Sequence, residues 1–134
     1  MKFAGTTEKG TSVGGIIKTF EYYGFPIKHG TTTIKQLREA IDNKFPTIIT
    51  IQAYRASYEP YSKCWDDGHY VVAIGYSDTR IYFEDPASYC RTWLSDLELE
   101  ERWHDSDDTG QALNWGCTVI GKPAYKRNTS IHMD

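Results

Sequence analysis

The sequence predicts one domain of the α+β class, with helices packed on a mostly antiparallel sheet. Helical patterns come first in the chain, and runs of β-branched and aromatic residues follow them. At 134 residues, of which 40% are hydrophobic, the chain is long enough to bury a core of its own. We expect that core to span residues 4–122, with a polar tail over 123–134. The whole of 1–134 is therefore expected to be a single unit.

Two segments predict helices. In GTSVGGIIKTFEYYGF (residues 10–25), Thr11 or Ser12 can cap the helix and Gly24 can end it. In TTIKQLREAIDN (residues 32–43), Thr32 or Thr33 can act as the cap. Apolar residues recur at helical spacing in both segments: Val13, Ile16, Ile17 and Phe20 in the first, and Ile34, Leu37 and Ile41 in the second. A short extended segment over residues 25–28 joins them.

The second part of the chain predicts strands. Residues 47–51 form a β-branched run typical of a buried strand, and an aperiodic polar stretch over 56–67 reads as a surface loop. The segments HYVVAIGY and RIYFED are separated by a short polar turn, which favours a β-hairpin. The expected strands after the loop cover residues 69–76, 80–85 and 114–123.

A third helix is expected to start near Ser95. Glu98 follows Ser95 by three residues, which is the capping-box pattern, and Leu99 and Trp103 then face inward. We expect this helix to continue into HDSDDTG (residues 104–110). The acids there could hold a hard cation, but the remaining ligands of a calcium loop are absent, so a solvated helix end is favoured. No metal and no cofactor are predicted.

Charge and composition exclude several classes of partner. The net charge of −3 favours neither nucleic acid nor an acidic membrane surface. No apolar run approaches the roughly 18 residues needed to span a bilayer, and the N-terminus lacks the apolar segment of a signal peptide. We therefore expect a soluble, cytoplasmic protein.

The three cysteines are Cys64, Cys90 and Cys117. Their odd number and wide spacing argue against a disulfide framework or a zinc site. Cys117 lies in an apolar strand and is expected to be buried, whereas Cys64 and Cys90 lie in polar, aromatic-rich loops and are expected to be accessible.

His69 and Asp85 are the candidate catalytic residues. They lie 16 positions apart, at the outer ends of the two hairpin strands, where Cβ atoms come within about 5–8 Å of each other. A carboxylate there can orient the imidazole and leave its second nitrogen free as a general base. Two other interpretations stay open: an ion pair that only holds the hairpin together, or a strand-edge histidine with no role.

A nucleophile is harder to place. Cys64 is the nearest cysteine, five residues before His69, but a loop preceding a strand is an unusual origin for an activated thiol. Thr11 and Ser12 stand at a helix start, where capping explains them without catalysis. Cys64 is retained as the candidate nucleophile from within the chain.

Four stretches resemble papain-like cysteine peptidases, in particular the bacterial domains that process double-glycine leader peptides of bacteriocins. They are AGTTEKGTSVGGIIKTFEYYGF, FPTIITIQAY, GHYVVAIGYSDTRIYFEDPA and WLSDLELEERWHD, and the similarity runs from Ala4 to about Ile120. The resemblance implies a papain-like fold and cleavage of leader peptides after small residues. It also implies that His69 is the general base and Asp85 the orienting carboxylate.

The chain departs from this family at its start. In the family, a helix with a Cys-Gly pair, preceded by an oxyanion-hole glutamine, comes before the Gly-Thr-Thr turn. Here the sequence begins MKFAGTT, and none of the three cysteines occupies the matching position. We therefore expect a truncated or inactive peptidase domain that lacks the N-terminal catalytic helix.

Two alternatives remain. The chain could be a non-catalytic module that binds a peptide or protein (a pseudoenzyme), or a second chain could supply the nucleophile. The missing helix normally packs centrally, so its loss should expose an apolar groove. From this we expect a homodimer, or association with the missing segment.

Overall fold

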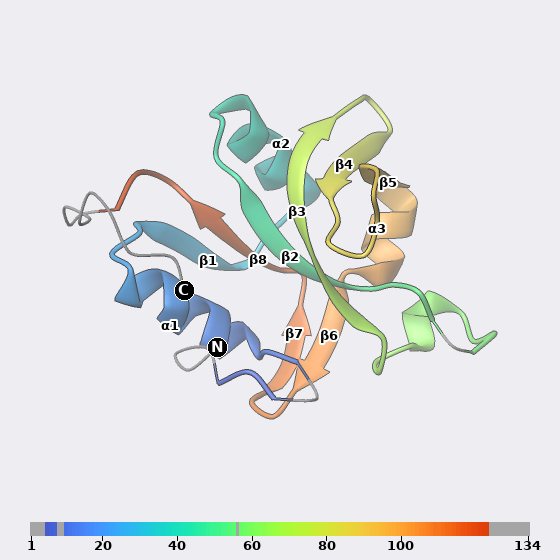
Figure 1. Ribbon diagram of the computed structural model, residues 1–134. Coiled ribbons are helices and arrows are strands. Elements are labelled where there is room, and N and C mark those ends of the chain that lie inside the picture. Colours follow the sequence, from blue (N-terminus) through green and yellow to red (C-terminus); the bar gives the residue numbers. More distant parts are fainter. Residues whose placement is uncertain (1–4, 8–9, 56, 124–134) are drawn as a thin grey trace.

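A six-stranded antiparallel sheet organises the chain in the computed structural model, which describes residues 5–7, 10–55 and 57–123 (Figure 1). The strands lie in the order β1-β8-β2-β3-β4-β5. Their bounds are Ile27–Thr31 (β1), Thr47–Gln52 (β2), Gly68–Tyr76 (β3), Arg80–Glu84 (β4), Thr92–Ser95 (β5) and Trp115–Val119 (β8). Strand β8, late in the sequence, thus lies between β1 and β2, which come early. This part of the sheet therefore forms only when segments far apart in the sequence have come together.

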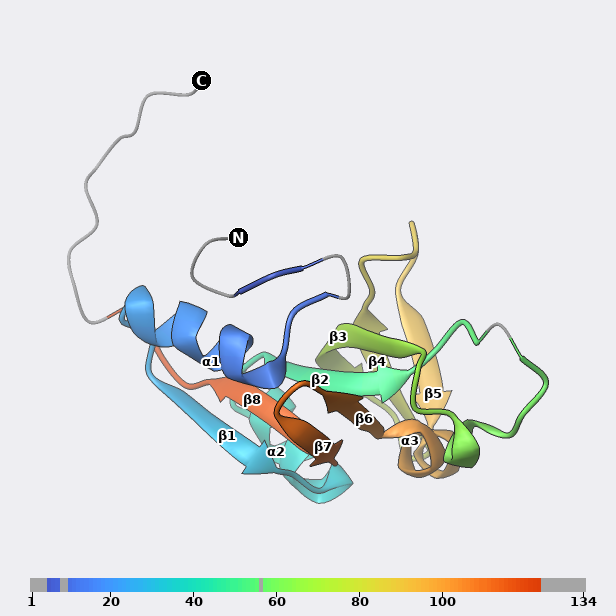
Figure 2. The same cartoon turned by 90° about the horizontal axis from the view of Figure 1, so that it is seen from below.

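Within the described residues, three α-helices cover this sheet from both sides (Figure 2). Helix α1 (Val13–Tyr22) packs its apolar residues on one face, together with Trp115 and Cys117. Helices α2 (Ile34–Asp42) and α3 (Asp96–Arg102) cover the other face, where Leu37 and Leu99 are fully buried. The expected α+β class is confirmed.

The helices start where their caps predict. The Ser12 hydroxyl accepts from the Gly15 N–H at the start of α1. Complete capping boxes open the other two helices, Thr33 with Gln36 at α2 and Ser95 with Glu98 at α3. Local hydrogen bonds of this kind satisfy backbone groups that have no partner within the helix, and each is worth about 1 kcal/mol.

Residues 104–110 do not continue α3, so the expected solvated helix end is wrong. The helix stops at Arg102, and His104–Asp107 (β6) pairs with Gly110–Leu113 (β7) in a separate two-stranded sheet. Asp107 accepts from Thr109 across the turn, an arrangement that competes with helix continuation. Within the described residues, no group of three or more His, Cys, Asp or Glu side chains could hold a metal ion.

Strand β2 is buried on both faces, as its β-branched run indicates. Ile49 and Ile51 point into the core beneath α2 and α3, and Ile48 packs on the α1 side. Its polar residues are paired: the buried Gln52 donates to the His104 carbonyl and accepts from the Asp67 N–H. Strand β2 thereby anchors both the main sheet and the β6–β7 hairpin.

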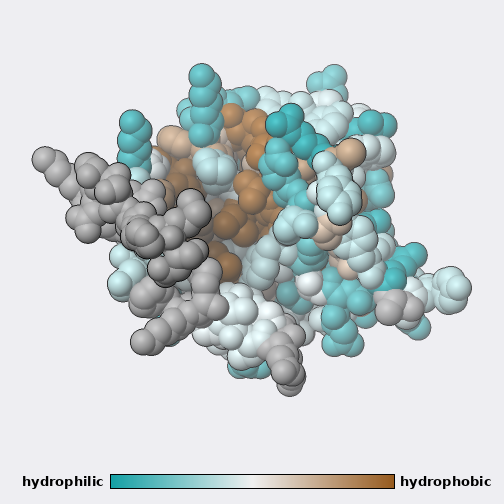
Figure 3. All heavy atoms as spheres, in the orientation of Figure 1, coloured by the Kyte–Doolittle hydropathy of each residue, from teal (hydrophilic) through white to brown (hydrophobic). Residues whose placement is uncertain are grey.

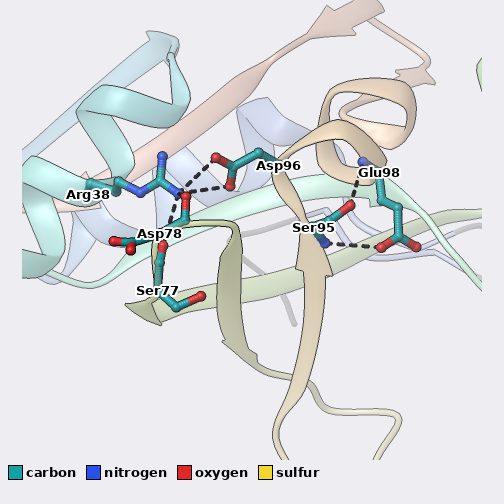
Figure 4. A network of polar contacts seen from close by, with 6 residues as sticks. All are labelled: Arg38, Ser77, Asp78, Ser95, Asp96 and Glu98. Carbon is teal, nitrogen blue, oxygen red and sulfur yellow. Dashed lines mark hydrogen bonds and ion pairs between the residues drawn. The ribbon is translucent and has the colours of Figure 1, made fainter.

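The β3–β4 hairpin is held at its turn by Arg38 of α2. One guanidinium nitrogen, Nη2, lies 2.8 and 2.9 Å from the two carboxylate oxygens of Asp96, and it donates to the Ser77 carbonyl at 3.1 Å (Figure 4). This single side chain joins α2, the hairpin turn and the start of α3. Both strands of the hairpin, as expected, flank residues 77–79. No helix in the described part of the chain is long and apolar enough to cross a membrane.

Candidate functional site

His69 and Asp85 meet at the end of the β3–β4 hairpin opposite its turn. His69 is the second residue of β3, and Asp85 directly follows β4. Val72 pairs with Glu84, so the two candidates face each other diagonally rather than directly. His69 Nε2 lies 2.6 Å from Asp85 Oδ1, with exposed side-chain fractions of 18% and 4%. The expected proximity of the two residues is found.

Asp85 is surrounded by donors. Oδ1 also accepts from the Ala87 N–H at 2.9 Å, while Oδ2 accepts from the Tyr54 hydroxyl at 2.7 Å and from the Thr92 hydroxyl at 3.3 Å. Burial alone would raise the pKa of Asp85, but the hydrogen bonds from Tyr54, His69 and Ala87 outweigh it, and the pKa lies below its ordinary value. Asp85 is therefore an ionised acceptor at neutral pH.

An ionised carboxylate only accepts, so the hydrogen on the bridging nitrogen belongs to His69 Nε2. In the neutral imidazole the lone pair is then on Nδ1, which has no hydrogen-bond partner within the described residues. Since no buried side-chain nitrogen or oxygen there is unpaired, Nδ1 reaches solvent. In that neutral tautomer, Nδ1 is the nitrogen that can accept a proton.

Tyr54 completes this cluster and was not found by sequence reasoning. Its backbone adopts a left-handed conformation, with φ of 55°, two residues after the end of β2. The ring then meets the His69 ring edge-on, with centroids 5.3 Å apart, although 60% of Tyr54 is exposed. A bulky residue in this region costs about 1–2 kcal/mol, and no local sequence signal marks it.

Cys64 is buried, so its expected accessibility is wrong. Only 6% of the residue is exposed, and its Sγ points at the carbonyls of Glu59 and Pro60. The short helix η1 (Tyr61–Lys63) turns Cys64 inward, and His104 Nε2 donates to the Cys64 carbonyl at 2.7 Å. This burial argues against Cys64 as a nucleophile.

The other cysteines follow expectation. Cys90 is exposed, and Cys117 is fully buried. Burial raises the pKa of the Cys117 thiol to about 11. Within the described residues no cysteine sulfur is hydrogen-bonded to His69.

An apolar groove of about 420 Å³ lies beside Asp85 on the α1 face of the sheet. Ile16, Ile48, Tyr70 and Val72 line it, and Glu84, Asp85 and Pro86 form its end. Apolar atoms gather on this face in Figure 3, beside α1. The expected apolar groove is therefore present on this face.

Comparison with known proteins agrees with this architecture. A protein from Bacillus anthracis described as a C39-like peptidase has a solved structure that matches with a TM-score of 0.63, at 16% sequence identity. The match covers 85% of this chain but 61% of the other, so this chain spans less than two thirds of that protein. At such low identity the likeness shows the fold alone.

No curated protein gives a significant match to this chain. Family comparison is more informative, because residues 1–106 match the Peptidase C39 family. Since that match takes in well over half of the sequence, the protein belongs to the Peptidase C39 family.

Proposed function

We propose that this domain takes part in thiol-dependent peptide cleavage, with His69 as general base and Asp85 as the carboxylate that orients it. The observation that carries the proposal is the 2.6 Å contact between Nε2 and Oδ1, which leaves Nδ1 free for a proton. Family membership supports peptide cleavage as the chemistry. The proposed substrates are leader peptides cut after small residues, as the resemblance implies.

In this proposal the two residues act on a thiol that approaches Nδ1. The imidazole takes the thiol proton, and the adjacent carboxylate stabilises the imidazolium that results. The thiolate then attacks the peptide carbonyl, and the imidazolium returns its proton to the leaving amine. Water hydrolyses the thioester in a second step, with His69 again as the base.

The thiol is proposed to come from outside these 134 residues. Cys64 and Cys117 are buried, Cys90 is exposed, and within the described residues none of the three sulfurs is hydrogen-bonded to His69. The apolar groove beside Asp85 offers a surface on which a helix carrying the nucleophile could pack. Its floor is formed by β2 and by β3, the strand that carries His69.

The first test is to read the coding DNA directly upstream of the Met1 codon. An in-frame extension encoding Gln…Cys-Gly and an apolar helix would supply the nucleophile in the same polypeptide. The extended protein should then release a fluorophore from a peptide ending in Gly-Gly, and His69→Ala should lower kcat/KM at least 100-fold. His29→Ala, on the exposed part of β1, is the matched control.

The apolar groove favours a second candidate function, a non-catalytic peptide-binding module that acts as a homodimer. Exposed apolar surface of this kind drives association in water. Sedimentation velocity at micromolar concentration should then show a dimer, which Val72→Glu converts to monomer. Peptide binding that survives alkylation of all cysteines favours the module, whereas a monomer in sedimentation contradicts the dimer.

A further inference from the structure

A second cavity, of about 400 Å³, lies on the opposite face of the sheet from the apolar groove. Its floor is apolar and is formed by Ile51, Ala53, Val71, Phe83 and Leu94. Four of these five side chains belong to the main core, and Ala53 packs against it. Core side chains are therefore accessible from this cavity, and its volume lies in the range of small-molecule binding pockets.

The walls of the cavity come from η1 and α3. The Arg102 guanidinium lies 3.8 Å from the centre of the Tyr61 ring and so fastens η1 to α3. Glu98, also on α3, places a carboxylate oxygen 3.8 Å from Arg102. Because these opposite charges stand together, the wall formed by α3 carries no net charge, and the apolar floor selects for an uncharged group.

The mouth of the cavity is continuous with the candidate site. Asp85, Tyr54 and Thr92 line it, and the hydroxyls of Tyr54 and Thr92 both donate to Oδ2 of Asp85. Asp85 also touches His69 at 2.6 Å. An extended peptide advances about 3.3 Å per residue, so a peptide held at His69 comes within one or two residues of the cavity.

We propose that this cavity is a side-chain pocket that takes one aromatic residue of a peptide bound at His69. Rings of Phe83, Tyr54 and Tyr61 border it, and aromatic pairs gain from edge-on contact beyond simple burial. The link to a peptide rests on the proposed function. Binding of an aromatic group by the cavity does not, so the two can fail separately.

The test uses the full chain and three small probes, the N-acetyl amides of phenylalanine, leucine and alanine. Amide chemical shifts followed by ¹H–¹⁵N NMR should change saturably with the phenylalanine probe at Ala53, Tyr61 and Leu94. The phenylalanine probe should bind at least tenfold more tightly than the alanine probe and more tightly than the leucine probe.

Ala53→Phe fills the cavity and should weaken binding of the phenylalanine probe at least tenfold. Leu113→Phe is the control, because it adds a ring at an exposed position on β7, outside the lining of this cavity, and should change the affinity less than twofold. If the Ala53 variant does not fold, Tyr61→Ala removes one wall of the cavity and should weaken the probe at least fivefold.

Three results would overturn the proposal: shifts confined to the opposite groove around Ile48 and Val72, equal affinity for the phenylalanine and alanine probes, or tighter binding of the leucine probe. His69→Ala separates this proposal from the catalytic one. It should abolish peptide cleavage by an extended enzyme while leaving probe affinity within twofold.

Discussion

The Tyr54 hydroxyl donates a 2.7 Å hydrogen bond to Oδ2 of Asp85, the oxygen that does not face His69. The Asp85 carboxylate is thus hydrogen-bonded at both oxygens, by a tyrosine that follows β2 and by a histidine at the start of β3. These two hydrogen bonds restrict rotation of the carboxyl group and so fix the orientation of the His69 imidazole. Tyr54 is the proposed positioning residue of this site.

Tyr54→Phe should raise the pKa of Asp85 towards its ordinary value, because the lost hydrogen bond favours the ionised form. The free energy of unfolding should fall by about 1 kcal/mol, modest because Tyr54 is largely exposed. Carbon-13 NMR titration of the carboxyl groups and urea unfolding measure the two effects. Tyr58→Phe, at a fully exposed tyrosine, is the control, and an unchanged Asp85 pKa would contradict the positioning role.

Asp85 should contribute stability that disappears in acid. Its pKa in the folded chain is lowered from 3.8, so its contribution is present above that value and is lost as pH falls through the folded pKa. At pH 7, Asp85→Asn should be less stable than wild type by about 1–3 kcal/mol. Urea unfolding between pH 7 and pH 2.5 should show the two proteins converging below about pH 4. A gap that stays constant with pH would disprove this linkage.

Asp105 should behave in the opposite way. Burial raises its pKa in the folded chain, against the hydrogen bonds from Ser106, Thr50 and Gln52 that lower it. Its contribution is therefore greatest below its ordinary pKa and is lost as pH rises through the folded pKa. Relative to Asp105→Asn, wild type should gain stability as pH falls from 7 towards 4, in the same urea experiment. If wild type instead lost stability relative to Asp105→Asn as pH falls, the effect of these hydrogen bonds on the Asp105 pKa would exceed that of burial.

Gly68, directly before His69, should not tolerate a side chain. A Cβ at this position would stand 2.7 Å from Cγ of Asp105, which Thr50 and Gln52 hold in place. Gly68→Ala should cost about 1–3 kcal/mol of stability by overpacking. Gly75→Ala on the same strand is the control, since its nearest neighbour would lie at 3.8 Å.

A double variant makes the cause of that loss explicit. In Gly68→Ala/Asp105→Ala the obstructing carboxylate is gone, so part of the stability should return relative to the sum of the single changes. Strict additivity in chemical denaturation would mean that the two side chains do not compete for space.

Cysteine labelling should follow burial. Cys90 is exposed and should react with iodoacetamide at least tenfold faster than Cys64 or Cys117, as followed by mass spectrometry of the intact chain and its peptides. His69→Ala should leave all three rates within twofold. Fast labelling of Cys64 that depends on His69 would instead restore Cys64 as a nucleophile.

Features that depend on neighbouring residues were predictable from the sequence. The start of α3 follows from Ser95 and Glu98, whose side chains bond to each other's backbone within one turn. The β3–β4 hairpin follows from two apolar runs around a short polar turn, and its pairing brings His69 to Asp85. These contacts arise along one continuous stretch, so pattern and spacing are sufficient to find them.

Features that depend on residues far apart in the sequence were not predictable from the sequence. Asp105 lies in a strand of the β6–β7 hairpin and is held by Thr50 and Gln52, more than fifty positions earlier. Its segment looks like a polar helix end until those partners are in place. Cys64 lies in a polar stretch, yet η1 and His104 enclose it.

The sequence by itself determined the class of fold, the caps of the helices and the hairpin that carries His69 and Asp85, because local hydrogen bonds and side-chain periodicity are written in adjacent residues. Only the tertiary structure decided that Tyr54 donates a hydrogen bond to Asp85, that Cys64 is buried and that a cavity lies beside Asp85. Those outcomes depend on which strands become neighbours. A residue that is buried by a segment far away in the sequence need not lie in a periodic pattern of apolar residues, so its own surroundings in the sequence do not predict its burial.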